Sequence, residues 1–153
     1  MAPGLSLKGR ALRYLAAREH SRLELERKLR EHEETPGQLA QVLDALEAKG
    51  FISEERVADS VVHRRAGKLG AARVRVELQA KGLGEAVIRE AVDALRETEQ
   101  ARAHAVWLKR FGQPPQDAAE RAKQWRFLAS RGFAPEVLRR VVGGEGPGEQ
   151  ADD

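Results

Sequence analysis

Residues 63–83 read HRRAGKLGAARVRVELQAKGL, and this stretch sets the helical pattern of the chain. The glycines inside it predict that one helix ends here and that a second helix begins near Ala71. On this second helix Ala71, Val74 and Leu78 recur at the i, i+3, i+7 spacing of a buried apolar face. The stretch therefore predicts two helices joined by a short turn.

The same stretch is strongly basic. From Ser60 to Val76 the sequence contains no Asp or Glu. The candidate binding residues are its cations together with one at the end of the second helix: Arg64, Arg65, Lys68, Arg73, Arg75 and Lys81. Two interpretations stay open, a solvated helix face and a basic platform for an anionic partner; five unopposed cations favour the platform. On the second helix we expect Arg73 to pair with Glu77 at i+4.

The composition fits a helical protein with much surface. Charged residues make up 33% of the 153 residues and aromatic residues only 5%, which argues against a β-sandwich. The net charge is +3, but residues 143–153 contain four acids and no base, so residues 1–142 carry +7. A basic body of this kind fits an acidic partner such as nucleic acid or an acidic protein groove.

Three classes of feature are missing from the sequence. It has no cysteine, which excludes disulfides, thiolate metal sites and thiol nucleophiles. Its apolar runs are too short for a transmembrane helix, and residues 1–8 lack the apolar core of a signal peptide. We therefore expect a cytoplasmic protein without a membrane partner.

Hydrophobic periodicity predicts an all-α, elongated body of about nine helices in tandem sets of three. After a loose lead at residues 1–5, the sets are expected at residues 6–52, 53–96 and 97–142. One helix is expected to end before residue 97 and another to begin there. Residues 143–153 form an acidic, glycine-rich tail that we expect to be disordered.

Capping residues predict where individual helices begin. Ser21 with Glu24 has the spacing of a capping box, in which each side chain binds the other residue's backbone N–H. Thr35, followed by Pro36 and by Gln38 at the third position, predicts a second helix start with Thr35 as N-cap.

A repeated phrase predicts a common way of ending helices. Each copy has an apolar residue, a cation near the negative end of the helix, a glycine cap and an apolar contact. The copies are Leu46-x-x-Lys49-Gly50-Phe51, Leu78-x-x-Lys81-Gly82-Leu83 and Leu128-x-x-Arg131-Gly132-Phe133. The first copy lies on the third helix of its set and the others on the second, so the repeat is imperfect.

No pattern in the sequence indicates catalysis. The four histidines, at 20, 32, 63 and 104, form no metal-binding pair, and we expect them at the surface. The sequence contains no phosphate-binding loop of the GxxxxGK[ST] kind and no nucleophile elbow. We predict that the protein is not an enzyme and uses no cofactor or metal.

A helix-turn-helix around Gly70 would place Arg73 and Arg75 in a DNA groove. The second helix offers mostly Ala and Val beside these arginines, which argues against reading of base sequence. Contact with the DNA backbone stays open.

Five motifs in order make the chain resemble the RecX family, regulators of the RecA recombinase. The resemblance covers roughly residues 8–142. The motifs are Arg18 followed by Glu24-Leu25-x-x-Lys28-Leu29, Val42-x-x-x-Leu46-x-x-x-Gly50-Phe51-Ile52, Glu55-Arg56-x-Ala58, Gly70-x-x-Arg73-Val74-x-x-Glu77-Leu78-x-x-Lys81-Gly82 and Phe127-Leu128-x-x-Arg131-Gly132-Phe133. The chain departs from the family pattern at Glu55, Val57 and Ala71, which are cap, packing and turn positions.

The resemblance implies tandem three-helix repeats and an inhibitor that lies in the groove of the RecA–DNA filament. It also implies that filament growth, ATPase activity and strand exchange are reduced. Two other functions stay open: a non-specific DNA-binding or architectural protein, with weak DNA contacts, and a helical-repeat adaptor without a nucleic-acid role. We expect a monomer, since a linear repeat body does not require a dimer.

The tail gives a first test. Truncation after Val142 removes four negative charges and no apolar face, so the melting temperature should hardly change. Affinity for non-specific duplex DNA at low salt should rise slightly. A large fall in melting temperature would show that residues 143–153 pack against the body.

Overall fold

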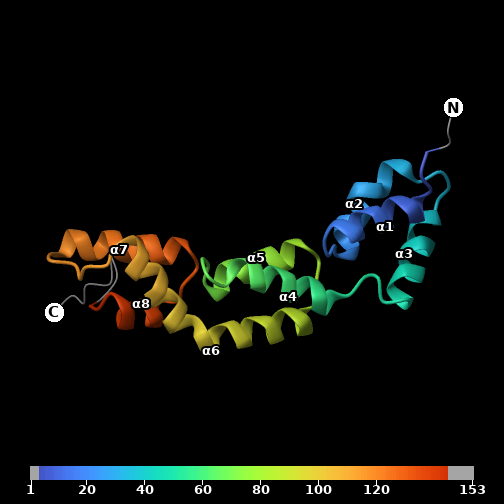
Figure 1. Ribbon diagram of the computed structural model, residues 1–153. Coiled ribbons are helices and arrows are strands. Elements are labelled where there is room, and N and C mark those ends of the chain that lie inside the picture. Colours follow the sequence, from blue (N-terminus) through green and yellow to red (C-terminus); the bar gives the residue numbers. More distant parts are fainter. Residues whose placement is uncertain (1–3, 145–153) are drawn as a thin grey trace.

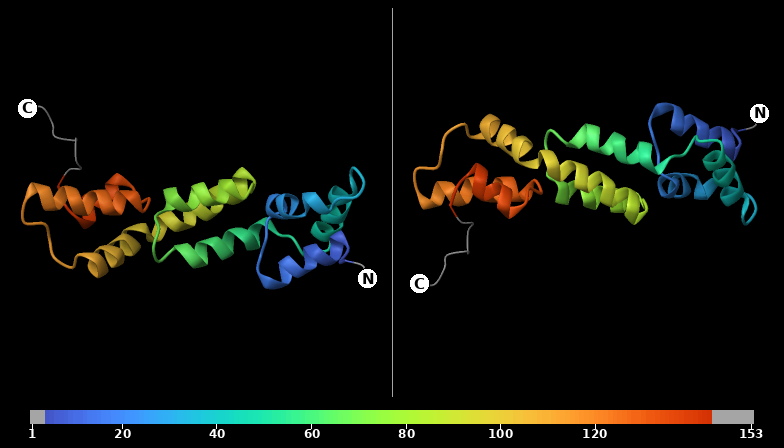
Figure 2. Two further views of the ribbon diagram at one scale, coloured as in Figure 1. Left: turned by 90° about the horizontal axis from the view of Figure 1, so that it is seen from above. Right: turned by 90° about the horizontal axis from the view of Figure 1, so that it is seen from below.

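The computed structural model describes residues 4–144, and these residues contain eight α-helices, one short 3-10 helix and no strand. The predicted all-α, elongated fold is thereby confirmed. The helices form three modules in a row, with the first module at one end of the molecule and the third at the other (Figure 1). Views from above and below show the same extended arrangement (Figure 2).

The first module consists of α1 (Leu7–Ala17), α2 (Arg22–Leu29), a 3-10 turn (Arg30–His32) and α3 (Gln38–Ala48). Two of its helices, α1 and α2, begin after a serine N-cap. Ser6 caps α1, and Ser21 with Glu24 forms the complete capping box of α2. The core consists of Leu7, Ala11, Leu25, Leu29, Leu39, Leu43, Leu46 and Ile52.

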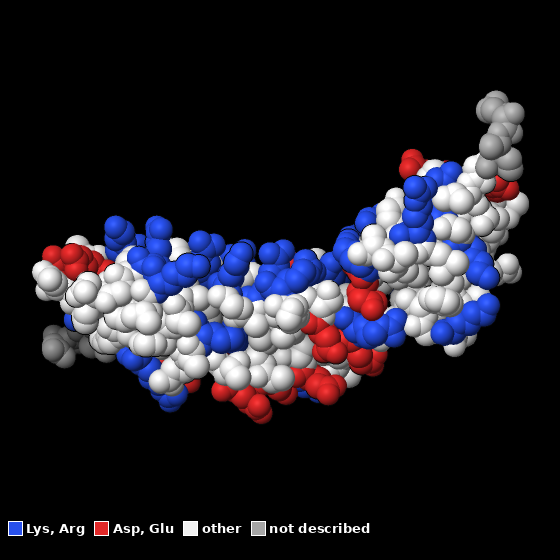
Figure 3. All heavy atoms as spheres, in the orientation of Figure 1, with Lys and Arg blue, Asp and Glu red and all other residues white. Residues whose placement is uncertain are grey.

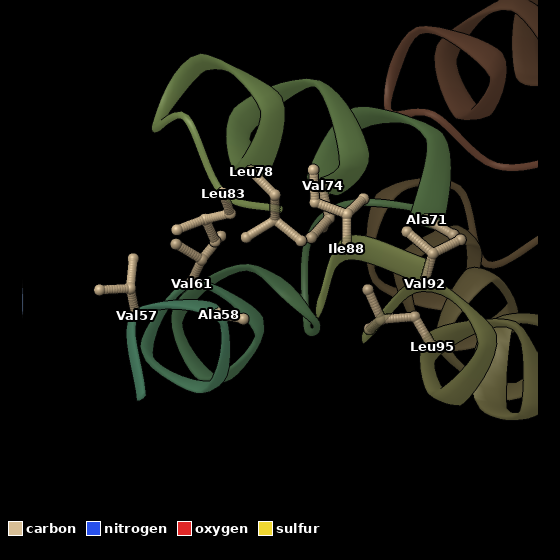
Figure 4. Packing of buried hydrophobic residues seen from close by; sticks show 10 residues of the cluster. All are labelled: Val57, Ala58, Val61, Ala71, Val74, Leu78, Leu83, Ile88, Val92 and Leu95. Carbon is tan, nitrogen blue, oxygen red and sulfur yellow. The ribbon is translucent and has the colours of Figure 1, made fainter. Parts of the chain in front are cut away.

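The second module combines α4 (Glu54–Arg65), α5 (Ala71–Ala80) and the first half of α6 (Glu85–Arg110). The expected apolar face of α5 is confirmed, since Val74 and Leu78 are fully buried. Figure 4 shows these side chains meeting those of α4 and α6. The core consists of Val57, Ala58, Val61, Ala71, Val74, Leu78, Leu83, Ile88, Val92 and Leu95.

The third module combines the second half of α6 with α7 (Ala118–Ser130) and α8 (Pro135–Val141). Its core contains two tryptophans, and the Trp107 indole N–H donates to Gln124 Oε1 at 2.8 Å. The core consists of Ala103, Trp107, Trp125, Leu128, Phe133, Leu138 and Val142.

The helix break expected near residue 97 is wrong. α6 runs unbroken through this point and belongs to both the second and the third module. No Gly or Pro lies between Glu85 and Arg110, and nothing else in that segment stops the backbone hydrogen bonds. The last two modules therefore share one rigid helix.

The predicted N-cap of α3, Thr35, is also wrong. Gly37 and not Thr35 is the N-cap residue, and it has a positive φ of 86°. The carboxylate of Glu33 takes the capping role from outside the turn, because Oε2 accepts from the Leu39 N–H at 2.8 Å. The Gln38 amide oxygen accepts from the Glu34 N–H and closes the turn.

The predicted common helix ending is confirmed at α3, α5 and α7. In each copy the N–H of the apolar residue after the glycine bonds back to the carbonyl of the leucine that begins the phrase. The three glycines have left-handed backbones. This is the Schellman arrangement, which satisfies carbonyls left free at a helix end.

His20 contradicts the expectation of surface histidines. Its ring is buried between α1 and α2, with Nδ1 3.0 Å from the Arg18 carbonyl and Nε2 2.9 Å from Lys28 Nζ. The Lys28 ammonium also lies over the Tyr14 ring at 4.6 Å. Burial lowers the pKa of His20, so the neutral ring serves as a structural link.

A buried carboxylate joins the second module to the third. Glu99 on α6 is only 3% exposed. Its Oε1 accepts from the Ala71 N–H at the start of α5, at 2.6 Å, and its Oε2 accepts from the Ala134 N–H at the start of α8, at 3.3 Å. A negative charge at two helix N-termini is favourable on both sides.

Backbone contact between two glycines completes this joint. The Gly70 N–H donates to the Arg131 carbonyl at 2.7 Å, and the Ala72 N–H donates to the Gly132 carbonyl. A Cβ on Gly70 would overlap the Gly132 carbonyl, and one on Gly132 would overlap the Arg73 backbone. The joint therefore requires both glycines.

Ion pairs hold the first module against the second. Glu24 accepts from Lys81 at 3.1 Å, and Arg56 donates to Glu19 at 2.9 Å. Within the first module, Glu24 also accepts from Arg18 at 2.7 Å. Burial alone would raise the pKa of Glu24, but Arg18, the Ser21 N–H and Lys81 lower it to about 2.

Most of the tail that we expect to be disordered, residues 145–153, lies outside the described residues. The same holds for residues 1–3 of the expected lead.

Gly70→Ala tests the glycine contact. The added methyl group overlaps the backbone of Gly132, which cannot move without disturbing the joint. We therefore expect the free energy of unfolding to fall by about 1–3 kcal/mol. Gly67→Ala is the matched control, because a Cβ there has no neighbour within 4 Å. Chemical denaturation measures both, and equal stability of the two variants would contradict the packing of this joint.

Glu24→Gln tests the ion pairs of the first joint. Since the folded-state pKa of Glu24 lies below its usual 4.5, ionised Glu24 stabilises the protein above that pH. Its contribution is lost as the pH falls from about 4.5 toward about 2. The wild type should therefore exceed the variant by about 2–3 kcal/mol at pH 7 and by almost nothing near pH 2.

Denaturation at a series of pH values measures this difference, with Glu90→Gln, at an exposed position of α6, as control. A stability difference that stays constant between pH 7 and pH 2 would show that Glu24 is not held by these cations.

Candidate functional site

A groove lies where the turn between α4 and α5 meets the second half of α6 and the end of α7. Its volume is about 990 Å³. Six of its lining residues are cations and one, Glu77, is an acid. We call this groove the basic groove. Its lining consists of Arg65, Gly67, Lys68, Leu69, Arg73, Val76, Glu77, Ala80, Ala105, Val106, Lys109, Arg110, Phe127 and Arg131.

Lys and Arg gather beyond the groove as well. Figure 3 shows them along one side of the molecule, over α5 and α7. Asp and Glu gather on the opposite side, over the first half of α6, and near the first module. In this view most Lys and Arg of the second and third modules lie on one side, and most Asp and Glu of the second module lie on the other.

Three of the six predicted binding residues line the basic groove: Arg65, Lys68 and Arg73. Lys68 is exposed, and its ammonium forms no hydrogen bond or ion pair with the described residues. The expected pair of Arg73 with Glu77 is wrong. Arg73 instead donates to the Ser130 carbonyl at 2.6 Å, which ties α5 to the end of α7.

Glu77 pairs with Arg65 across the turn, at 3.1 Å. The packing of α4 places Arg65 beside Glu77 on α5. Arg73 instead contacts the third module, through the Ser130 carbonyl. Tertiary contacts therefore override the i+4 pairing that the sequence of α5 suggests.

The other three predicted residues do not line the basic groove. Arg64 is exposed on α4, and Arg75 pairs with Glu85 at the start of α6. Lys81 is largely buried in its ion pair with Glu24, so it holds the first module and does not face a partner. The predicted set thus divides between the groove and the structural joints.

Sequence reasoning missed three cations of the groove: Lys109 and Arg110 on α6, and Arg131 after α7. Arg110 and Arg131 lie over the Phe127 ring, with guanidinium carbons 5.0 Å and 4.8 Å from its centroid. Arg131 belongs to the repeated helix-ending phrase, so its sequence context indicates only a cation at a helix end. It also lines the basic groove.

Arg102 fixes the turn that carries Lys68. Its guanidinium donates to the carbonyls of Ala66 and Leu69 at 2.9 Å and 2.7 Å, and so satisfies the free end of α4. Burial lowers the pKa of Arg102, while nearby Glu99 opposes this shift. Arg102 thus links the turn that carries Lys68 to α6.

The arrangement suits binding of an anionic partner. Groups of three or more His, Asp and Glu that could hold a metal do not occur among the described residues. None of the helices in this part of the chain combines the length and apolar character that a membrane crossing needs.

Sequence comparison assigns all three modules to one family. Residues 8–46, 53–92 and 97–142 match the first, second and third three-helix domains of RecX. The proteins named "Regulatory protein RecX" of Leptothrix cholodnii and Ralstonia pickettii are 58% and 51% identical over 140 residues. The matches cover 92% of this chain and 89% and 88% of those proteins.

Solved structures show the same fold. One titled "Crystal structure of regulatory protein RecX" has a TM-score of 0.75 at 24% identity, over 88% of this chain and 70% of that chain. RecX from Lactobacillus salivarius has a TM-score of 0.71 at 21% identity, over 89% and 92%. The predicted resemblance is confirmed: the chain belongs to the RecX family of regulatory proteins.

Proposed function

We propose that this chain regulates the RecA recombinase without catalysis, as a monomer in the cytoplasm. It binds in the groove of the RecA–DNA filament and limits filament growth, ATPase activity and strand exchange. The observation that supports this most is the gathering of Lys and Arg along one side of an elongated body (Figure 3). Membership in a family of regulatory proteins agrees with it.

The shape and the charge suit the same partner. A filament of protein on DNA offers an extended surface, and modules in a row can follow it while a single compact domain cannot. Clustered cations raise the local concentration of an anionic partner and speed its association, an effect that salt weakens. The acidic side of the body disfavours binding in the reverse orientation.

Several cations of the basic groove are free to meet such a partner. Lys68 and Lys109 are exposed and form no side-chain hydrogen bond or ion pair with residues 4–144. Arg110 and Arg131 contact an aromatic ring and no carboxylate of the described chain, so their charge is not neutralised there. These four positions carry the proposal better than Arg75 or Lys81.

A second candidate function is non-specific DNA binding, which the same one-sided charge supports. The two differ in their partner. A RecA regulator should bind DNA coated with RecA more tightly than bare single-stranded DNA. A DNA-binding protein should bind both, and its affinity should fall as the salt concentration rises. The slope of log affinity against log salt concentration should be about one per phosphate contact.

Reversing two exposed cations tests the proposed function. Lys68→Glu combined with Lys109→Glu changes the charge of the basic groove by four without breaking an internal bond. Inhibition of the DNA-dependent ATPase of RecA should need at least about tenfold more of this variant than of the wild type, the effect of losing two charged contacts.

Arg89→Glu combined with Arg96→Glu is the matched control, because both residues are exposed on α6 outside the groove. It should inhibit as the wild type does. Full inhibition by the Lys68/Lys109 variant would show that another surface meets RecA. Arg73 and Arg75 are less suitable for reversal, since each holds a contact inside the body.

A further inference from the structure

The basic groove has an apolar floor beneath its cationic rim. Val76 on α5 is 60% exposed and lies in the lining of the basic groove. It stands beside aliphatic and small side chains from both modules. These are Leu69, Ala80, Ala105 and Val106.

We infer that the basic groove docks an acidic amphipathic helix of a partner protein. Apolar side chains of that helix cover Val76 and the floor, and its carboxylates meet the cations of the rim. The inference rests on the proposed function and deepens it, because it assigns this surface to a protein component of the filament.

The charges of the rim match carboxylates on a helix. Lys68 and Arg73 stand on the side of the second module, and Lys109 and Arg131 on the side of the third. A helix lying between them presents carboxylates to both sides when acids flank its apolar stripe. Of the six cations only Arg65 is paired with a carboxylate of the described chain.

The dimensions also suit a short helix. The wall formed by α5 extends from Arg73 to Ala80, about 10 Å at the rise of an α-helix. The small side chains of Ala80 and Ala105 allow a helix backbone to approach closely. About two turns of a partner helix would lie along this wall and place two or three apolar side chains on the floor.

The aromatic content of the groove argues against single-stranded nucleic acid. Such sites stack bases on exposed aromatic rings. Phe127 is the aromatic residue of the lining, and its ring already meets Arg110, Arg131 and the edge-on ring of Phe111. A phosphate backbone would leave the apolar floor uncovered, which is why a protein partner fits better.

A designed peptide tests the inference with the full chain. The probe is a fluorescent peptide of about four helical turns, with Leu at i, i+3, i+4 and i+7 and mainly Glu elsewhere. Its affinity is measured by anisotropy, beside that of a scrambled peptide of the same composition and an oligothymidylate. The amphipathic peptide should bind at least about tenfold more tightly than the scrambled one.

Val76→Gln removes the centre of the floor and leaves all charges in place. It should weaken binding of the amphipathic peptide about tenfold, the contribution of one buried valine, and leave the oligothymidylate unaffected. Leu108→Gln is the matched control, since Leu108 is 56% exposed on α6 outside the lining. It should bind as the wild type does, and circular dichroism checks that both variants are folded.

The inference would be overturned if the scrambled peptide bound as tightly as the amphipathic one. It would also be overturned if Val76→Gln bound the amphipathic peptide as tightly as the wild type does. A parallel loss of oligothymidylate affinity in that variant would assign the groove to nucleic acid instead. Failure of the peptide while the wild type still inhibits RecA would reject the docking and keep the proposed function. Binding of the peptide without any inhibition of RecA would reject the function and keep the docking.

Discussion

The buried carboxylate of Glu99 is the interaction on which the geometry of the last two modules depends. Its two oxygens accept from the first N–H of α5 and from the N–H that precedes α8, so one side chain fixes two helices to α6. An ionised group in such a place is stable only while these hydrogen bonds persist. The close approach of Gly70 and Gly132 adds a backbone contact between the start of α5 and the end of α7, and the walls of the basic groove follow from both.

The two joints between modules differ in kind. The second and third modules share the continuous helix α6 and a buried polar contact, whereas the first module is held by the ion pairs Glu24–Lys81 and Glu19–Arg56. Lys81 and Glu24 are largely buried, whereas Arg56 and Glu19 are more exposed. Salt should therefore weaken the Glu19–Arg56 pair more than the Glu24–Lys81 pair.

Local signals in the sequence predicted most of the fold. The apolar spacing of Val74 and Leu78 fixed the buried face of α5, and Ser21 with Glu24 formed the expected cap. The break expected near residue 97 and the cap expected at Thr35 failed locally, whereas the side-chain pairing failed because of residues distant in sequence: Glu77 pairs with Arg65, and Arg73 contacts the third module. The candidate site was half predicted for the same reason. A cluster in sequence revealed Lys68, but only the packing of α6 and α7 brings Lys109 and Arg131 beside it.

The distance across the basic groove tests this account most directly. The chain contains no cysteine, so Gln79→Cys and Arg126→Cys, at exposed positions on α5 and α7, allow two spin labels to be attached specifically. Pulsed electron–electron double resonance then gives the distribution of distances between the two modules. We predict one narrow distribution in the parent chain and a clearly broadened one after Glu99→Gln, which keeps the shape but removes the charge and one acceptor. An equally narrow distribution in the Glu99→Gln chain would contradict the claim that this carboxylate fixes the groove.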